Sequence, residues 1–496
     1  MSGSVRHVRV GIVGAGFAGL GMAAQLVRHG RDDFLIVERA SEVGGTWRDN
    51  SYPGAACDIR SDLYSFSFAP KPDWARRYAP QPEILEYLKG VADRFELRPR
   101  ILFDAELLRA EWSDGDGDGD GTIDGHWTVE TSRETFTCTV LVSGHGPLIE
   151  PKWPAIPGLE TFAGPRFHSA QWRHDVELAG ADVAVIGTGA SAIQFVPELQ
   201  KIARSVTVYQ RSAPWIVPRA DAPTSPGRRW RFARHPALQR MSRAVVFASA
   251  EFRFLGFRFR AVGRVFEAVS RAFLRREVAD PVLRAQLTPD FRIGCKRILI
   301  SSDYYRALTQ PNVTLVTDPV ASIDAEGVAT VDGEHHRADV LIGGTGFDAT
   351  HPPIARLIVG RGGVPLAERW SPHMSALHGT SVADFPNLFL LVGPNTALGH
   401  NSIVAIIEAQ LGYVLGALDE LDARAAGSLE PDPAVQLAHN EKLQQALRGS
   451  VWESGCANFY LDDSGRNTTL WPGTVLAFRR ALRRFDAREY IWVTHH

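Results

Sequence analysis

The stretch that decides the fold is Val8-Arg-Val-Gly-Ile-Val-Gly14-Ala-Gly16-Phe-Ala-Gly19. Its apolar residues predict a buried strand, and the glycines predict a tight turn into a helix over 20–29. Gly14 permits the turn, Gly16 lets a pyrophosphate approach the backbone, and Gly19 lets helix and strand pack closely. The segment therefore predicts a dinucleotide-binding crevice, with the helix N-terminus facing the anion.

The residue after the second strand indicates which nucleotide this crevice binds. A short apolar run, Phe34–Val37, predicts that strand, and Glu38 follows it directly. A carboxylate at this separation binds the ribose hydroxyls of a dinucleotide that lacks a 2′-phosphate. We therefore predict FAD at the first crevice.

A second unit of the same kind occurs in the middle of the chain. Gly187, Gly189 and Ala192 follow an apolar strand pattern, and Arg211 comes shortly after the next predicted strand, Val206–Tyr209. A carboxylate here would repel a 2′-phosphate, whereas an arginine binds it with charge-assisted hydrogen bonds. We favour this role over a surface ion pair, and we predict NADPH at the second crevice.

The duplication predicts an α/β fold with two Rossmann-like dinucleotide-binding domains and a helical insertion. We assign residues 1–150 and 351–496 to an FAD-binding domain, 151–220 and 294–350 to an NADPH-binding domain, and 221–293 to the insertion. Many arginines interleave with Phe, Val and Leu in the insertion. We favour a solvated polar face of packed helices over a membrane-surface contact.

Composition argues against several classes of protein. A formal net charge of -2 over 496 residues argues against nucleic acid as the main partner. The four cysteines form no C-x-x-C pair and have no zinc-ligand spacing, so we expect reduced thiols, no metal and a cytoplasmic location. The run Asp114–Gly121 mimics the start of a calcium loop. Because Gly125 stands where such a loop needs glutamate, we expect a flexible hairpin tip instead.

One motif between the two glycine turns narrows the function. Phe162-Ala-Gly164-Pro-Arg-Phe-His168-Ser-Ala-Gln-Trp172 matches F-x-G-x-x-x-H-x-x-x-W, the fingerprint of the Baeyer–Villiger monooxygenases, which the chain thus resembles. Arg173 departs from the Pro or Asp that usually follows the tryptophan. Flavin monooxygenases that oxidise nitrogen and sulfur share the F-x-G-x-x-x-H core, so the distinction depends on Trp172 and on a Y-P-G-x-x-x-D segment at Tyr52–Asp58.

Further segments are similar to signatures of the same family and extend over about two thirds of the chain. They are Gly44-Gly-Thr-Trp47, Tyr52-Pro-Gly-Ala-Ala-Cys-Asp58, Gly294-Cys-Lys296-Arg297 and Gly344-Thr-Gly-Phe-Asp348. The first three contain residues that the resemblance places at a cofactor or at the reacting centre, and the fourth is similar to the family's A-T-G-F-D return strand.

The resemblance implies a mechanism and a role for each residue. Reduced flavin and O2 would form a C4a-peroxyflavin, whose anion attacks a small-molecule ketone to give an ester or lactone. An anion in a dry site needs a fixed cation, and Arg297 matches the family's active-site arginine. Asp58 matches the carboxylate that orients it. Lys296 matches the residue that helps Arg211 hold the 2′-phosphate.

Two further roles follow from the same resemblance. Trp47 and Asp58 are expected at the FAD site, and His168 is expected in cofactor-linked domain movement near the domain linker. Two alternatives remain open at this stage. One is oxygenation of sulfur or nitrogen, and the other is a non-catalytic flavoprotein that senses redox state.

Overall fold

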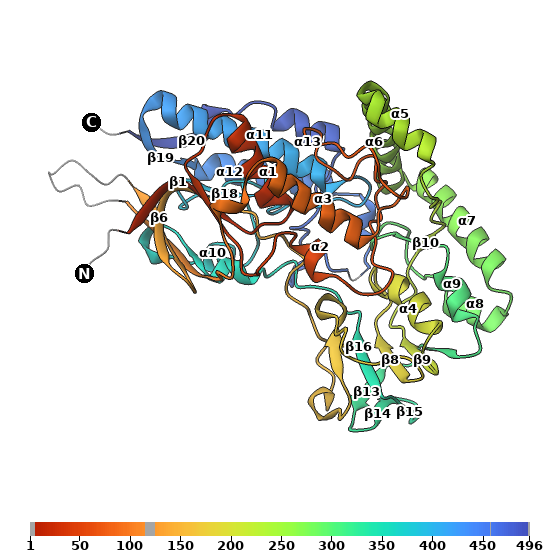
Figure 1. Ribbon diagram of the computed structural model, residues 1–496. Helices are drawn as coiled ribbons and strands as arrows, with labels where there is room; N and C mark the ends of the chain where they lie inside the picture. Colours follow the sequence, from red (N-terminus) through yellow and green to blue (C-terminus); the bar gives the residue numbers. More distant parts are fainter. Residues whose placement is uncertain (1–4, 115–124, 457, 495–496) are drawn as a thin grey trace.

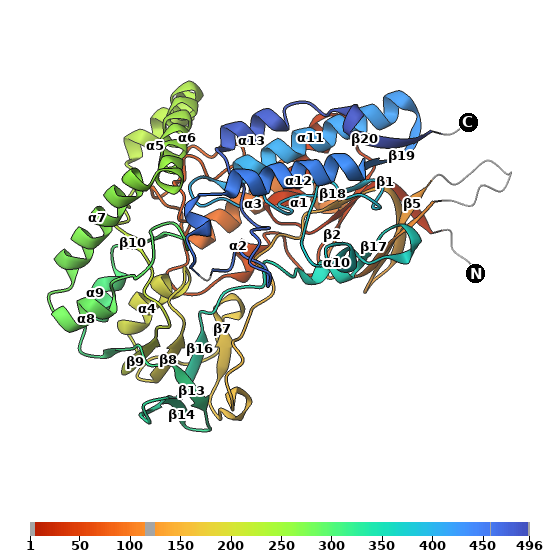
Figure 2. The same cartoon turned by 180° about the vertical axis from the view of Figure 1, so that it is seen from behind.

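The computed structural model describes residues 5–114, 125–456 and 458–494. Two α/β halves lie next to each other (Figure 1). The larger half combines the two ends of the chain, and the smaller half comes from its middle. A group of helices extends along the outer edge of the molecule, as Figure 2 shows from behind.

The larger half is built on an eight-stranded sheet in the order β17-β4-β5-β6-β1-β2-β3, with β18 beside β6. β1 and β2 pair in parallel with Val13 opposite Val37, so the Gly14 turn and Glu38 lie at the same edge. The strands are β1 (Arg6–Val13), β2 (Phe34–Val37), β3 (Ile101–Leu102), β4 (Leu107–Ser113), β5 (His126–Thr131), β6 (Thr135–Ser143), β17 (Ile358–Val359) and β18 (Leu388–Leu390).

Helix α1 (Phe17–Arg28) packs between this sheet and two further helices, α3 (Gln81–Arg94) and α11 (Ile403–Arg424). It begins three residues before the predicted start at residue 20, because the last part of the glycine turn is already helical. The rest of this half comprises α2 (Thr46–Asp49), α10 (Leu366–Arg369), α12 (Pro433–Leu447), α13 (Val475–Ala481), β19 (Ala426–Pro431) and β20 (Tyr490–Thr494).

The smaller half contains a parallel sheet in the order β12-β9-β8-β16-β7. Ile186 lies opposite Tyr209 in the register of β8 and β9, so the Gly187 turn and the segment with Arg211 reach one edge. Its elements are β7 (Arg166–His168), β8 (Asp182–Ile186), α4 (Ala192–Gln200), β9 (Ser205–Tyr209), α9 (Tyr304–Leu308), β12 (Val313–Val316) and β16 (Val340–Gly343), with a meander of β13 (Val320–Ile323), β14 (Gly327–Thr330) and β15 (His335–Arg337).

The insertion is helical, as the sequence predicted. It comprises α5 (Pro226–Arg234), α6 (Pro236–Arg258), α7 (Arg260–Glu277) and α8 (Pro281–Gln286), and the short pair β10 (Ile216–Val217) and β11 (Leu299–Ile300) brings its ends together. The prediction of a polar outer face is wrong in part. Met241, Val245 and Phe252 are 60%, 64% and 66% exposed.

The expectation of reduced thiols is wrong for one cysteine pair. Cys295 and Cys456 form a disulfide across 161 residues, whereas Cys57 and Cys138 are free and buried. Sequence spacing did not predict this pair because only the folded chain brings the two segments together. The bond ties the segment that carries Arg297 to the C-terminal part of the larger half.

The predicted hairpin in the first sheet is present. β4 and β5 pair antiparallel, with Ser113 opposite His126. Residues 115–124 lie outside the described residues, so the flexible tip expected in the Asp114–Gly121 run stays a prediction.

Candidate active site

Asp58 and Arg297 form an ion pair that joins the two halves. Asp58 lies in the loop after α2, and Arg297 lies just before β11, 239 residues further along the chain. The Nη2 atom of Arg297 donates a hydrogen bond to Oδ2 of Asp58. The two side chains remain 38% and 33% exposed, so the pair borders accessible space.

The two partners fix each other's charge. The charge of Asp58 raises the pKa of Arg297, although burial opposes this. Burial alone would raise the pKa of Asp58, but the charge and hydrogen bond of Arg297, with the charge of Arg219, bring it below its ordinary value. Arg297 therefore supplies a permanent cation, and Asp58 restrains its position.

The loop that carries Asp58 is held against the second half by Gln194 of α4. The hydroxyl of Tyr52 donates to Oε1 of Gln194 at 3.0 Å, and Nε2 of Gln194 donates to the carbonyl of Ala56 at 3.0 Å. Gly54 has a φ of +79°, and a Cβ there would lie 2.6 Å from the carbonyl oxygen of Gln194. The Tyr52–Asp58 segment therefore needs this glycine to approach α4.

Lys296 and Arg211 place two positive charges beside the second glycine turn. The Nζ atom of Lys296 donates to Oγ of Ser212 at 2.9 Å, next to Arg211 in the chain. Burial and the charge of Arg211 lower the pKa of Lys296, while Asp290 opposes them. Arg211 is exposed and pairs with no carboxylate among the described residues. Two cations without a paired carboxylate fit a phosphate.

Glu38 is buried at the first crevice and contacts the glycine turn itself. Its Oε2 accepts a hydrogen bond from the backbone N–H of Ala15 at 2.8 Å. Its Oε1 accepts hydrogen bonds from the N–H of Ala40 at 3.0 Å and from Arg48 at 2.9 Å. The carboxylate thus lies where β2 ends, beside the turn that would receive the nucleotide.

The glycines of both turns have the geometry that a pyrophosphate requires. Gly14 and Gly187 adopt φ values of +92° and +106°, which a larger residue adopts only with strain. A Cβ added to Gly16 or Gly189 would have its nearest heavy atom 3.6 Å away, so the backbone is open on that side. An anion can approach both of these backbones.

Trp47 lies in α2, next to the loop that carries Asp58. Its indole Nε1 donates a hydrogen bond to the hydroxyl of Tyr64 at 3.0 Å, and the two rings meet edge to face. The side chain is half-buried against the core of the larger half. The N–H of Gly44 donates a hydrogen bond to the carbonyl of Ala15 at 2.9 Å, so the segment that carries Trp47 lies beside the first glycine turn.

His168 is buried between the two segments that connect the halves. Its ring meets Trp153 and Phe347 edge to face, at centroid distances of 6.0 and 5.8 Å. Its Nδ1 accepts a hydrogen bond from the N–H of Ala170 at 3.1 Å. Burial lowers the pKa of His168 to about 4, so the ring is neutral at physiological pH.

The other fingerprint residues are structural in position. Phe162 and Trp172 are buried, and Trp172 packs against Phe195 of α4 and Tyr52 at centroid distances of 5.4 and 6.5 Å. A Cβ on Gly164 would lie 2.2 Å from the carbonyl oxygen of Asp339. The fingerprint therefore packs the second sheet and supports the contact between the halves.

Sequence reasoning missed three residues around the ion pair, namely Gln194, Arg219 and Tyr460. Tyr460 is buried beside the pair, and burial raises its pKa to about 12, with opposing effects from Arg297 and Asp58. None of them belongs to a motif that the sequence analysis used, and each reaches the site only through the fold.

Two negative findings concern the described residues alone. No helix among them is both long and apolar enough to cross a membrane. No group of three or more His, Cys, Asp or Glu side chains in this part of the chain is arranged to hold a metal ion.

Comparison with known proteins agrees with this geometry. The sequence profile of the flavin-binding monooxygenase-like family matches residues 7–241. A Baeyer–Villiger monooxygenase of Streptomyces coelicolor is 46% identical over 98% of this chain and 92% of its own length. The chain belongs to the Baeyer–Villiger monooxygenases. A second member, from Pseudomonas aeruginosa, is 45% identical over the same shares of both chains.

The whole fold of this Baeyer–Villiger monooxygenase is similar to solved structures of other monooxygenases. An oxidised steroid monooxygenase bound to NADP superimposes with a TM-score of 0.86 at 32% identity, covering 99% of this chain and 100% of the other. A cyclohexanone monooxygenase from Rhodococcus sp. Phi1 bound to NADP+ gives a TM-score of 0.88 at 26% identity, with the same coverage. The two-domain α/β fold with its insertion is therefore that of the family.

Proposed function

We propose that this enzyme converts a ketone, O2, NADPH and a proton into an ester or lactone, NADP+ and water. The Asp58–Arg297 pair carries the proposal, because it places a permanent cation between the two nucleotide crevices. Oxygen insertion next to a carbonyl passes through negatively charged oxygen, and a fixed cation in a restricted site stabilises such charge.

The enzyme depends on FAD and NADPH, as its family does. We assign FAD to residues 1–150 and 351–496, where the Gly14 turn and Glu38 would hold it with Trp47 alongside. We assign NADPH to residues 151–220 and 294–350, where Arg211 and Lys296 would hold the 2′-phosphate. When bound, FAD would supply oxygen activation, and NADPH would supply the reducing hydride.

The chain's own residues contribute charge, orientation and exclusion of water. Arg297 stabilises negative charge during oxygen transfer, and Asp58 holds the guanidinium in place. Phe257 and Trp452 stack with ring centroids 5.5 Å apart near Gly294, and Tyr460 is buried beside the pair. These aromatic residues from the insertion and the C-terminal segment restrict water near Arg297.

The proposal is tested by replacing Arg297 with Ala. Turnover of ketone to ester should fall by about 10²- to 10³-fold, the loss typical for one such electrostatic group. Bound FAD, measured by its absorbance, should be retained, and flavin reduction by NADPH in stopped flow should fall less than oxygenation. Asp58→Ala should have a milder effect, because it removes the partner that orients the cation and leaves the cation itself.

Arg306→Ala provides the matched control, since Arg306 lies in the same half and pairs with Glu277 at the surface. It should leave ketone oxygenation unchanged. If Arg297→Ala converts ketone at the wild-type rate, the ketone assignment is wrong and oxygenation of sulfur or nitrogen should be tested. If Arg297→Ala loses turnover as expected, mass spectrometry of products from linear, cyclic and steroidal ketones identifies the substrate class.

A further inference from the structure

The helices of the insertion have a charge that differs sharply from the rest of the chain. Residues 226–277, all of them described, contain thirteen arginines, three glutamates and neither lysine nor aspartate, whereas the whole chain has a formal net charge of -2. Each glutamate already has a partner. Glu251 pairs with His400 at 3.4 Å, Glu267 with Arg271 at 3.6 Å and Glu277 with Arg306 at 2.6 Å. Arg228 and Arg243 pair with Asp62 and Glu408 of the larger half, and Arg271 and Arg276 pair with Glu267 and Glu277. The other nine arginines of these helices pair with no carboxylate among the described residues, so the helices carry an excess of positive charge.

Apolar side chains form an exposed stripe along the same helices. On α6, Met241, Val245 and Phe252 are 60%, 64% and 66% exposed. At 3.6 residues per turn they share one side of the helix, and Arg240 and Arg253 flank them on opposite sides. The neighbouring helices also carry exposed apolar side chains: Val265 and Val269 of α7 are 61% and 48% exposed, and Trp230 of α5 is 64% exposed.

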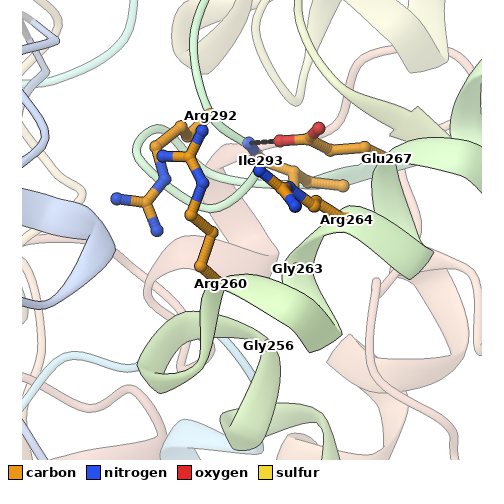
Figure 3. Close-up of a pocket in the computed structure, with 7 residues that line it drawn as sticks. All are labelled: Gly256, Arg260, Gly263, Arg264, Glu267, Arg292 and Ile293. Atoms are coloured by element: carbon orange, nitrogen blue, oxygen red, sulfur yellow. Dashed lines mark hydrogen bonds between the residues drawn. The ribbon is translucent and has the colours of Figure 1, made fainter.

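Three arginines converge on a small pocket where α6 meets α7 (Figure 3). Arg260 and Arg264 come from α7, and Arg292 comes from the segment that leads to Arg297. No carboxylate pairs with these three arginines anywhere in the described part of the chain. Glu267, the acid that lines the pocket, accepts a hydrogen bond from the N–H of Ile293 at 3.2 Å.

We propose that α5, α6 and α7 form a docking surface for an anionic lipid bilayer. The apolar stripe would enter the headgroup region, and Arg260, Arg264 and Arg292 would bind lipid phosphate. This goes beyond the proposed function and does not depend on it.

Two other occupants fit the surface less well. Nucleic acid would use the arginines but would leave the apolar stripe in water. A second copy of the chain would cover the stripe but would bring two strongly positive faces together. A bilayer with anionic headgroups satisfies both the charge and the apolar side chains.

The test is flotation of the FAD-loaded enzyme with vesicles of phosphatidylcholine, with and without phosphatidylglycerol. We expect several-fold more bound protein when phosphatidylglycerol is present, and most of it should dissociate in 1 M salt, where the Debye length is about 3 Å. The double variant Arg260→Ala/Arg264→Ala and the single variant Phe252→Glu should each lose most of the binding. Equal binding to both kinds of vesicle would overturn the proposal.

Matched controls lie outside these helices. Arg483→Ala/Arg484→Ala removes two exposed arginines after α13, and Leu437→Glu changes a residue of α12 that is 62% exposed. Both should bind like the wild type. NADPH oxidation with ketone in vesicle-free buffer should be unchanged in all four variants. Because flotation needs no substrate, failure of the lipid proposal and failure of the proposed function are distinguishable.

Three other results would overturn the proposal. If inorganic phosphate releases the protein completely while chloride of equal ionic strength does not, the pocket binds a free anion and not a membrane. If Phe252→Glu binds vesicles normally, the apolar stripe does not enter the bilayer. If sedimentation shows a dimer that Phe252→Glu dissociates, the surface is an interface between two copies.

Discussion

The two nucleotide crevices share one backbone design and differ in the residues that surround it. In both, a glycine with positive φ ends the first strand, and the second strand ends at the same edge of the sheet. The first crevice then presents buried Glu38, whereas the second presents exposed Arg211 next to Lys296. We propose that the backbone provides a general anion site and that the charge after the second strand selects the nucleotide.

The last residue of the G-x-G-x-x-G motif shows a second difference between the two crevices. A Cβ on Gly19 would lie 1.8 Å from the carbonyl oxygen of Gly14, so only glycine fits there. The second crevice has Ala192 at this position, buried at the start of α4. The first helix therefore approaches its turn more closely than the second helix does, which makes the first crevice less tolerant of change.

The largest effect should come from Gly19→Ala. The methyl group overlaps the Gly14 carbonyl, so α1 must move away from β1 and the larger half should fail to fold with FAD. Ala192→Gly is the matched change in the other crevice, and it should cost only about 0.5–1 kcal/mol. Soluble yield, flavin absorbance and urea unfolding measure both. If Gly19→Ala retains the FAD content of the wild type, the first helix does not approach its turn more closely than the second helix does.

Glu38→Arg should come next. The change removes the acceptor for Ala15, Ala40 and Arg48, and it brings a second cation to the first crevice. The protein should be soluble but largely colourless after purification. Glu130→Arg, at an exposed position of β5, should retain its flavin. Stoichiometric FAD with wild-type affinity in Glu38→Arg would mean that the two cofactors have been assigned to the wrong crevices.

Arg211→Ala should have a smaller and selective effect. Loss of one charge-assisted contact to the 2′-phosphate costs about 1.5–3 kcal/mol, so the KM for NADPH should rise about 10- to 150-fold while the KM for NADH hardly changes. Arg204→Ala, which removes a 61% exposed arginine of the same half, is the control. An unchanged preference for NADPH over NADH would contradict the assignment of Arg211.

The smallest effect concerns His168, which lies between the two connecting segments. Its folded-state pKa of about 4 lies below the ordinary value of 6.5, so the unfolded chain binds a proton first as pH falls. The free energy of unfolding should therefore decrease by about 2 kcal/mol from pH 7.5 to pH 5 through this group. His168→Gln should lose that slope in urea titrations, and His351→Gln, at an exposed site, should keep it. If the free energy of unfolding of His168→Gln falls with pH as steeply as that of the wild type, the burial of this ring does not cause the pH dependence.

Much of the fold could be predicted because its signals are local. The run Phe34–Val37 is a strand with the predicted bounds, and the helical nature of residues 221–293 was also predicted. α1 began three residues early because the turn merges into the helix. The outer face of the insertion was misjudged, since composition does not tell which apolar residues face neighbours and which face solvent.

The sequence by itself determined the two glycine turns, the charges of Glu38 and Arg211, and the motifs that contain Asp58 and Arg297. The glycine turns and the two charges follow from strand and helix periodicity among neighbouring residues. The motifs that contain Asp58 and Arg297 were assigned through the resemblance to the family. Only the tertiary structure decided that Asp58 meets Arg297 across 239 residues. It also decided that Gln194 holds the loop that carries Asp58. It also decided that Cys295 pairs with Cys456. Contacts of this kind depend on how two sheets and an insertion pack together, and no local pattern records that packing.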